Sequence, residues 1–134
     1  MRPTASDAAQ RVVDSSVWIE FLADGPLSAR CTPHLMPERE VVTPAHVLYE
    51  VYRWTLLHVG EQAAMEVVAH MEWTRLVSAD VTTAVVAVQI GVDHGLAAAD
   101  AIIYATARLE RCELVTLDSD FRGLPGVTLI EAEA

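Results

Sequence analysis

The chain has 134 residues, of which 52% are hydrophobic, and a formal net charge of −10. This length suits one domain with a sizeable core. No apolar run free of charged residues is long enough to cross a membrane, and the first residues lack the apolar core of a secretory signal. Cys31 and Cys112 lack the spacing of a metal site or a disulfide scaffold, so we expect a cytoplasmic protein. We predict a disordered tail over residues 1–10 and a single domain over residues 11–134.

All nine Lys/Arg positions are arginines, because the sequence contains no lysine. The absence of lysine excludes a P-loop, a Schiff-base enzyme and an aspartyl-phosphate site that needs a lysine partner. The negative charge argues against broad affinity for nucleic acids, although it permits a local arginine patch. It also favours a basic partner.

Short apolar strands alternate with helices along the chain. We predict strands over residues 11–14, 40–43, 75–78, 112–118 and 127–130. Between them we predict helices over residues 17–22, 27–36, 45–58, 61–73, 80–95 and 95–108. Strands that alternate with such helices form right-handed crossovers and a parallel sheet covered on both faces, so the expected fold is an α/β sandwich.

Four acids occupy positions that favour a common site. Asp14 and Asp118 end predicted strands, and the carboxyl ends of parallel strands form the edge at which α/β sheets bind ligands. Glu50 and Asp100 lie on predicted helices, each on a face that is otherwise apolar. The residues that share these faces are Val47, Trp54 and Leu57 for Glu50, and Leu96, Ile103 and Ala107 for Asp100.

Carboxylates gathered in one cleft need compensation, because burying an unpaired carboxylate is costly or raises its pKa. A divalent cation would provide that compensation. Oxygen ligands without histidine or cysteine favour Mg²⁺, with Mn²⁺ as the alternative. Such an ion can polarise a phosphodiester, activate water and stabilise the leaving oxygen.

Each acid also has a structural alternative. Asp14 could cap the helix that follows it, and Asp118 could form only an Asx-turn. Asp100 could be a favourable charge in the first turn of its helix, and Glu50 could pair with a core arginine. One metal site would explain all four acids together.

Four segments resemble the motifs of PIN-domain ribonucleases, in the order and spacing of that family. They are Val-Val-Asp14-Ser-Ser-Val, the helix with Glu50 after Val-Val-Thr-Pro, Leu-Ala-Ala-Ala-Asp100-Ala-Ile-Ile-Tyr, and Val-Thr-Leu-Asp118-Ser-Asp120-Phe. The similarity covers about residues 11–130, and the short chain is similar to VapC-type toxins of bacterial toxin–antitoxin pairs. The resemblance implies a three-layer α/β/α sandwich with a central, mainly parallel sheet of four to five strands.

The resemblance also implies metal ligands. Asp14, Glu50 and Asp100 match three acids of the family that surround Mg²⁺. The fourth acid corresponds to Asp118 or Asp120, and we favour Asp118.

The implied reaction is metal-dependent hydrolysis of RNA that leaves 5′-phosphate and 3′-hydroxyl ends. Ser15 and Thr116 match hydroxyl positions that help to orient a ligand or water.

The implied partners are an RNA substrate, a second copy of the chain in a homodimer, and a small VapB-like antitoxin that joins a heterotetramer or larger complex. The C-terminal segment of the antitoxin would lie in an apolar groove of the first helices, with Trp18, Phe21 and Leu22 as contacts. An arginine of that segment could point into the acidic cleft.

Two other functions stay open. A Mg²⁺-dependent α/β phosphatase or phosphoacceptor would use Asp14, but Ser16 stands where a second acid would be needed and no lysine is available. A non-catalytic module that binds an antitoxin or RNA would not need the acids at all.

Overall fold

The computed structural model describes residues 10–132 and has a five-stranded sheet at its centre. Neighbouring strands pair in parallel in the order β3-β2-β1-β4-β5. The strands are β1 (Arg11–Val13), β2 (Val41–Pro44), β3 (Arg75–Val77), β4 (Glu113–Thr116) and β5 (Val127–Leu129). The predicted parallel sheet is therefore confirmed. The predicted disordered tail lies outside the described residues, apart from its last residue.

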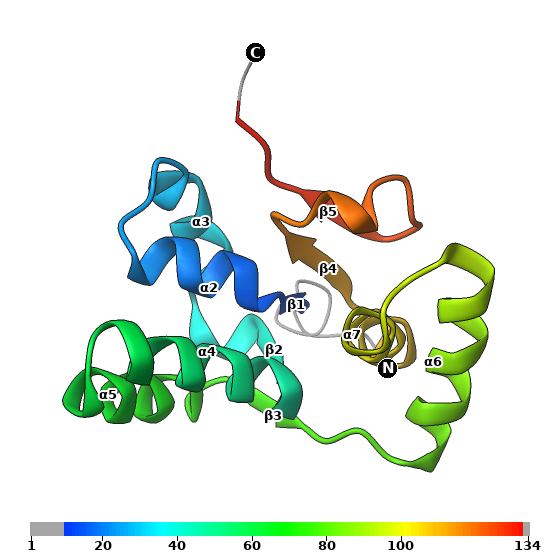
Figure 1. Cartoon of the computed structure of the whole chain (residues 1–134), viewed down its shortest axis with the longest axis horizontal. Helices are drawn as coiled ribbons and strands as arrows, with labels where there is room; N and C mark the ends of the chain where they lie inside the picture. The colour runs from blue at the N-terminus through cyan, green and yellow to red at the C-terminus, as the bar shows by residue number, and fades with distance from the viewer. Residues whose placement is uncertain (1–9, 133–134) are drawn as a thin grey trace, which may run out of the picture.

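Helices flank this sheet and complete the predicted α/β/α sandwich (Figure 1). They are α2 (Ser15–Leu22), α3 (Ser28–Leu35), α4 (Ala45–His58), α5 (Glu61–Met71), α6 (Val81–His94) and α7 (Ala98–Leu109), with the 3₁₀ helices η1 (Glu38–Glu40) and η2 (Ser119–Phe121). Helix α2 packs on α3 and α4, α4 packs on α5, and α6 packs on α7. Helix α7 begins later than predicted, because Gly95 ends α6 in the left-handed conformation and Ala97 is extended.

The strand order places a topological switch point between β1 and β4. From β1 the chain continues to β2 and β3 on one side, whereas β4 is followed by β5 on the other side. A crevice forms at such a point, outside the carboxyl ends of the strands. Asp14 directly follows β1 and Asp118 lies just beyond the end of β4, so both acids lie at the crevice.

The core lies between the sheet and the helices. Val12, Val13, Leu114 and Val115 of the two central strands are completely buried, and Ile103 of α7 is 1% exposed. These buried residues therefore belong to β1, β4 and α7, the elements that position Asp14, Asp118 and Asp100.

Helix α6 presents an apolar stripe to solvent. Val81, Val85, Val88 and Val92 recur at helical spacing and are between 62% and 81% exposed. The other side of α6 packs on α7 through Ala87. Among residues 10–132, no single helix is long and apolar enough to span a membrane; α6 and α7 meet that test only as a pair bent by 115°.

The buried side of α7 should contribute to the stability of the fold through the main core. We expect Ile103→Ala to lower the free energy of unfolding by about 2–5 kcal/mol, because it leaves a cavity in a fully packed site. The control is Leu57→Ala on α4, which should change that free energy by no more than about 0.5 kcal/mol because Leu57 is 61% exposed. Urea unfolding measures both, and equal losses would contradict the assignment of the core.

Candidate functional site

The predicted acids come together at the switch point. Carboxylate oxygens of Asp100, Asp118 and Asp120 lie within 4.8 Å of one another. The charges of Asp14 and Glu50 also act on Asp100, so all five acids share one electrostatic environment. They come from the end of β1, from α4, from the first turn of α7 and from the segment after β4.

Asp14 is the most buried of these acids, with 5% of its surface exposed. Its Oδ2 accepts hydrogen bonds from the hydroxyls of Ser16 and Thr116, each at 2.8 Å. Burial raises the pKa of Asp14, and the two hydroxyl donors partly oppose that rise. Asp14 occupies the N-cap position of α2, as its structural alternative predicted, but its side chain makes no capping hydrogen bond among the described residues, so side-chain capping does not account for the carboxylate.

Ser16 is the residue that the sequence analysis missed. Its Oγ donates to Asp14 and accepts from the backbone N–H of Leu117 at 3.0 Å, which ties the start of α2 to the end of β4. Thr116 has the same dual role, because its Oγ1 accepts from the N–H of Asp118 at 2.9 Å. The sequence signal that could have identified Ser16 is a hydroxyl residue two positions after an aspartate that ends a strand.

Ser15 contacts a different acid. Its hydroxyl donates to Oε1 of Glu50 at 3.1 Å and so links α2 to α4. His46 Nε2 lies 3.8 Å from the same oxygen. Burial raises the pKa of Glu50 above its ordinary value. No arginine among residues 10–132 forms an ion pair with Glu50, so the core-arginine alternative is wrong.

The predicted face of α4 needs a correction. Val47, Val51 and Thr55 form its buried stripe, whereas Leu57 is 61% exposed. Glu50 lies beside that stripe, with 36% of its side chain exposed. Residue spacings of three and four are compatible with more than one stripe along a helix. Packing against α2 determines which stripe is buried, and Glu50 is not part of it.

Asp100 has the most perturbed carboxyl group of the cluster. Its pKa is raised from 3.8 to about 6, first by burial and then by the charges of Asp118, Asp14, Asp120 and Glu50. Asp100 does lie in the first turn of α7, as its structural alternative required. A favourable helix dipole alone would lower the pKa, so repulsion and burial dominate here.

Asp118 and Asp120 form a short turn and still belong to the cluster. Asp118 Oδ1 accepts from the N–H of Asp120 at 2.9 Å, which is the predicted Asx-turn. Asp118 is half-buried and Asp120 is exposed. The turn therefore presents both carboxylates to Asp100, and either can serve as the fourth acid.

The donor set of this cluster fits a hard divalent cation. All five side chains offer carboxylate oxygens, the ligands that Mg²⁺ and Mn²⁺ prefer. Within the described range, none of the acids forms an ion pair with an arginine. Burial is the main reason that the pKa values of Asp14, Glu50 and Asp100 are raised, and for Asp100 the neighbouring carboxylates raise the pKa further.

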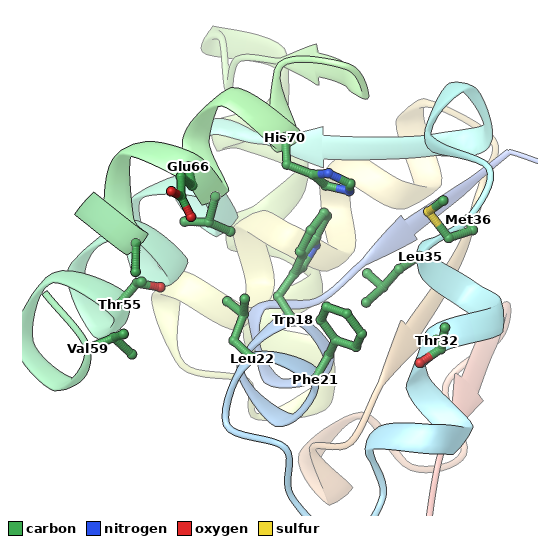
Figure 2. Close-up of a pocket in the computed structure, with 12 residues that line it drawn as sticks. Trp18, Phe21, Leu22, Thr32, Leu35, Met36, Thr55, Val59, Glu66 and His70 are labelled. Atoms are coloured by element: carbon green, nitrogen blue, oxygen red, sulfur yellow. The ribbon is translucent and has the colours of Figure 1, made fainter. Parts of the chain in front are cut away.

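A separate apolar groove contains the three predicted antitoxin contacts. A cavity of about 560 Å³ lies between α2, α3 and α5, and Trp18, Phe21 and Leu22 of α2 line it together with Glu66 and His70 of α5 (Figure 2). Trp18 is 2% exposed and Phe21 is 40% exposed. The ring of His70 meets Trp18 edge-on, with centroids 6.0 Å apart.

Comparison with known proteins gave a family and a fold. A family model described as PIN domain matches residues 11–127. Comparison with curated proteins gave no match.

Several solved structures are similar to the chain. A toxin–antitoxin complex from Klebsiella pneumoniae has a TM-score of 0.76 at 24% identity, covering 89% of this chain and 96% of that one. VapC20 of Mycobacterium tuberculosis, described as a toxin that cleaves the sarcin–ricin loop, has a TM-score of 0.71 at 22% identity, covering 88% and 97%. FitAcB from Neisseria gonorrhoeae has a TM-score of 0.65 at 23% identity, covering 83% and 89%. At these identities the likeness establishes the fold.

Removing the charge of Asp100 should stabilise the metal-free protein. Ionised Asp100 is disfavoured in the folded state, so its destabilising effect is complete above about pH 6 and disappears below about pH 4. We expect Asp100→Asn to raise the melting temperature in the presence of EDTA at about pH 8, and the gain to vanish at about pH 4. The exposed Asp93, changed to Asn, serves as the control and should give no such gain. If Asp100→Asn is no more stable than wild type at the higher pH, the proposed repulsion between Asp100 and the neighbouring carboxylates is contradicted.

Proposed function

This chain belongs to the PIN domain family, and from that premise we propose that it is a VapC-type toxin, a Mg²⁺-dependent endoribonuclease that acts in the cytoplasm. The observation that carries the proposal is the cluster of Asp100, Asp118 and Asp120, with Asp14 and Glu50 beside it, at the switch point of a parallel sheet. VapC20 of Mycobacterium tuberculosis, a structural neighbour described as a toxin that cleaves the sarcin–ricin loop, supports the same reaction.

The five acids would hold the metal. The hydroxyl groups that hydrogen-bond to them determine how rigidly the carboxylates are held. Bound Mg²⁺ would supply polarisation of the phosphodiester and an activated water. Ser16 and Thr116 fix one oxygen of Asp14 from two sides, and Ser15 fixes Glu50. Such supports orient the ligands before the ion or substrate arrives.

The geometry favours this function over a phosphatase that forms an aspartyl-phosphate. The carboxylate of Asp14 is buried, and its Oδ2 already accepts two hydrogen bonds. Ser16, which stands where a second acid would be needed, is one of the two donors. Covalent phosphorylation of Asp14 by a small phosphodonor would nevertheless favour the phosphatase.

We further propose a VapB-like antitoxin as partner. The groove at Trp18, Phe21 and Leu22 suits an apolar peptide segment, and the acids nearby suit an arginine from the same segment. The similar structure from Klebsiella pneumoniae is a toxin–antitoxin complex, which is consistent with this partner.

The proposed homodimer, and the heterotetramer or larger complex with the antitoxin, require an apolar surface for a second copy. The exposed valines of α6 offer one, because a contiguous apolar stripe on a soluble surface favours association.

The reaction is tested by cleavage of labelled RNA. We expect Mg²⁺-dependent cleavage that EDTA abolishes, with new 5′-phosphate ends. Asp100→Asn should lower the rate by at least about 100-fold, because loss of even an outer-sphere partner typically costs about 10–100-fold. Asp93→Asn, which changes an exposed aspartate outside the cluster, should leave the rate unchanged.

Equal cleavage by wild type and Asp100→Asn, purified in the same way, would contradict the metal mechanism. Growth arrest on expression distinguishes the non-catalytic module. If folded Asp14→Ala still arrests growth as strongly as wild type, binding without catalysis explains the effect.

The groove is tested by inhibition. Phe21→Glu should weaken binding of the VapB-like antitoxin by about 10-fold or more, because it buries a charge in an apolar contact. It should leave RNA cleavage by the free toxin intact. Leu109→Glu is the matched control, because Leu109 has similar exposure but lies on α7 outside the groove. Equal inhibition of both variants by the antitoxin would exclude the groove as its binding site.

A further inference from the structure

A second groove lies directly beside the acids, between α2 and α4. This aromatic groove has a cavity of about 510 Å³, and its lining includes Ser15, Tyr49, Glu50, Arg53, Trp54 and His58. Glu50 is one of the five acids of the cluster, and Ser15 donates a hydrogen bond to it. The groove is therefore continuous with the proposed metal site, and it shares no lining residue with the apolar groove at Trp18.

Flat rings occupy one side of the aromatic groove. Trp54 stacks on His58, with centroids 4.9 Å apart and planes 15° apart, and a 2.9 Å contact between His58 Nδ1 and the Trp54 carbonyl holds the pair. Tyr49 stacks on His46 at 5.9 Å and 29°. Tyr49 is nevertheless 59% exposed, which is a large exposure for an aromatic ring that is already partly packed. These pre-oriented rings offer faces on which a planar ligand can stack.

Arg53 gives the same groove a positive charge. It is exposed and forms no ion pair with any residue between 10 and 132. The three arginine ion pairs of the described chain lie elsewhere and involve Glu40, Glu110 and Glu131. A phosphate group that approaches the acidic cluster meets repulsion, so a nearby unpaired cation is the group that can hold it.

Aromatic faces combined with a cation are the chemistry that binds single-stranded nucleic acid. We propose that the aromatic groove binds one nucleotide of single-stranded RNA adjacent to the scissile phosphate, with its base stacked on Tyr49 or the Trp54–His58 pair and its phosphate at Arg53. This inference rests on the proposed ribonuclease function and adds to it where the substrate lies. Stacking tolerates every base, so the groove selects single strands and not a particular sequence.

The test measures binding with cleavage switched off. In the Asp100→Asn background, fluorescence anisotropy reports the Kd of a short labelled single-stranded RNA of mixed sequence and of an abasic strand of the same length. Tyr49→Ala should weaken binding of the RNA roughly 10-fold, while the abasic strand is unaffected. Arg53→Ala should weaken both probes. Tyr49→Phe should retain binding, and Leu57→Ala, an exposed apolar residue of α4 outside the groove, should bind like the parent.

A second readout uses the cleavage-competent chain, in which Tyr49→Ala should raise KM more than it lowers kcat. If Tyr49→Ala and Arg53→Ala bind RNA as Leu57→Ala does, the inference is overturned while ribonuclease activity can still stand. If wild type cleaves no RNA, the proposed function fails, and the Kd comparison still decides the groove. Unchanged RNA affinity with weakened binding of a basic peptide would overturn the inference and assign the groove to a protein partner.

Discussion

Uncompensated negative charge at one edge of the sheet is the constraint on which the rest of this structure depends. Three carboxylates lie within 4.8 Å of one another, and the charges of two more acids act on one of them, Asp100, from neighbouring elements. The described arginines that form ion pairs do so away from this edge, with Glu40, Glu110 and Glu131. The protein therefore stabilises the acids with hydroxyl and backbone donors, which orient the carboxylates without neutralising them.

The fold makes this concentration of charge possible. Parallel pairing of β1 with β4 brings residues about a hundred positions apart in the sequence to the same crevice, as the Thr116–Asp14 hydrogen bond shows. Helix α7 packs on α6 and β4 through buried side chains and carries the half-buried Asp100 in its first turn, so the core holds the repelling group in place. Stability stored in the core thus offsets the cost of bringing these carboxylates together.

Much of this could be predicted from the sequence, for identifiable reasons. Strand-ending acids were found because parallel strands align their carboxyl ends, and the helices were found because their periodicity is local. The prediction that Leu57 lies on the inward face of α4 was wrong, because Leu57 is exposed. Neighbouring stripes of a helix have equivalent residue spacings, and only packing determines which stripe is buried. Ser16 was missed because the direction of a hydroxyl depends on β4, which is remote in the sequence. The exposure of Tyr49 and Arg53 likewise could not be predicted from the sequence, because it depends on which elements cover α4.

Helix α2 connects the acidic cluster and the apolar groove over a very short distance. Ser15 lies at its first position and Phe21 six residues later, which corresponds to about 9 Å along the helix axis. An extended peptide covers that distance with about three residues. A chain seated against Phe21 therefore needs only a few further residues to place a side chain among the carboxylates. Under the proposed toxin–antitoxin function, inhibition then proceeds by direct occupancy of the site and leaves the fold unchanged. The length of the partner's tail is the variable that determines whether it blocks the site.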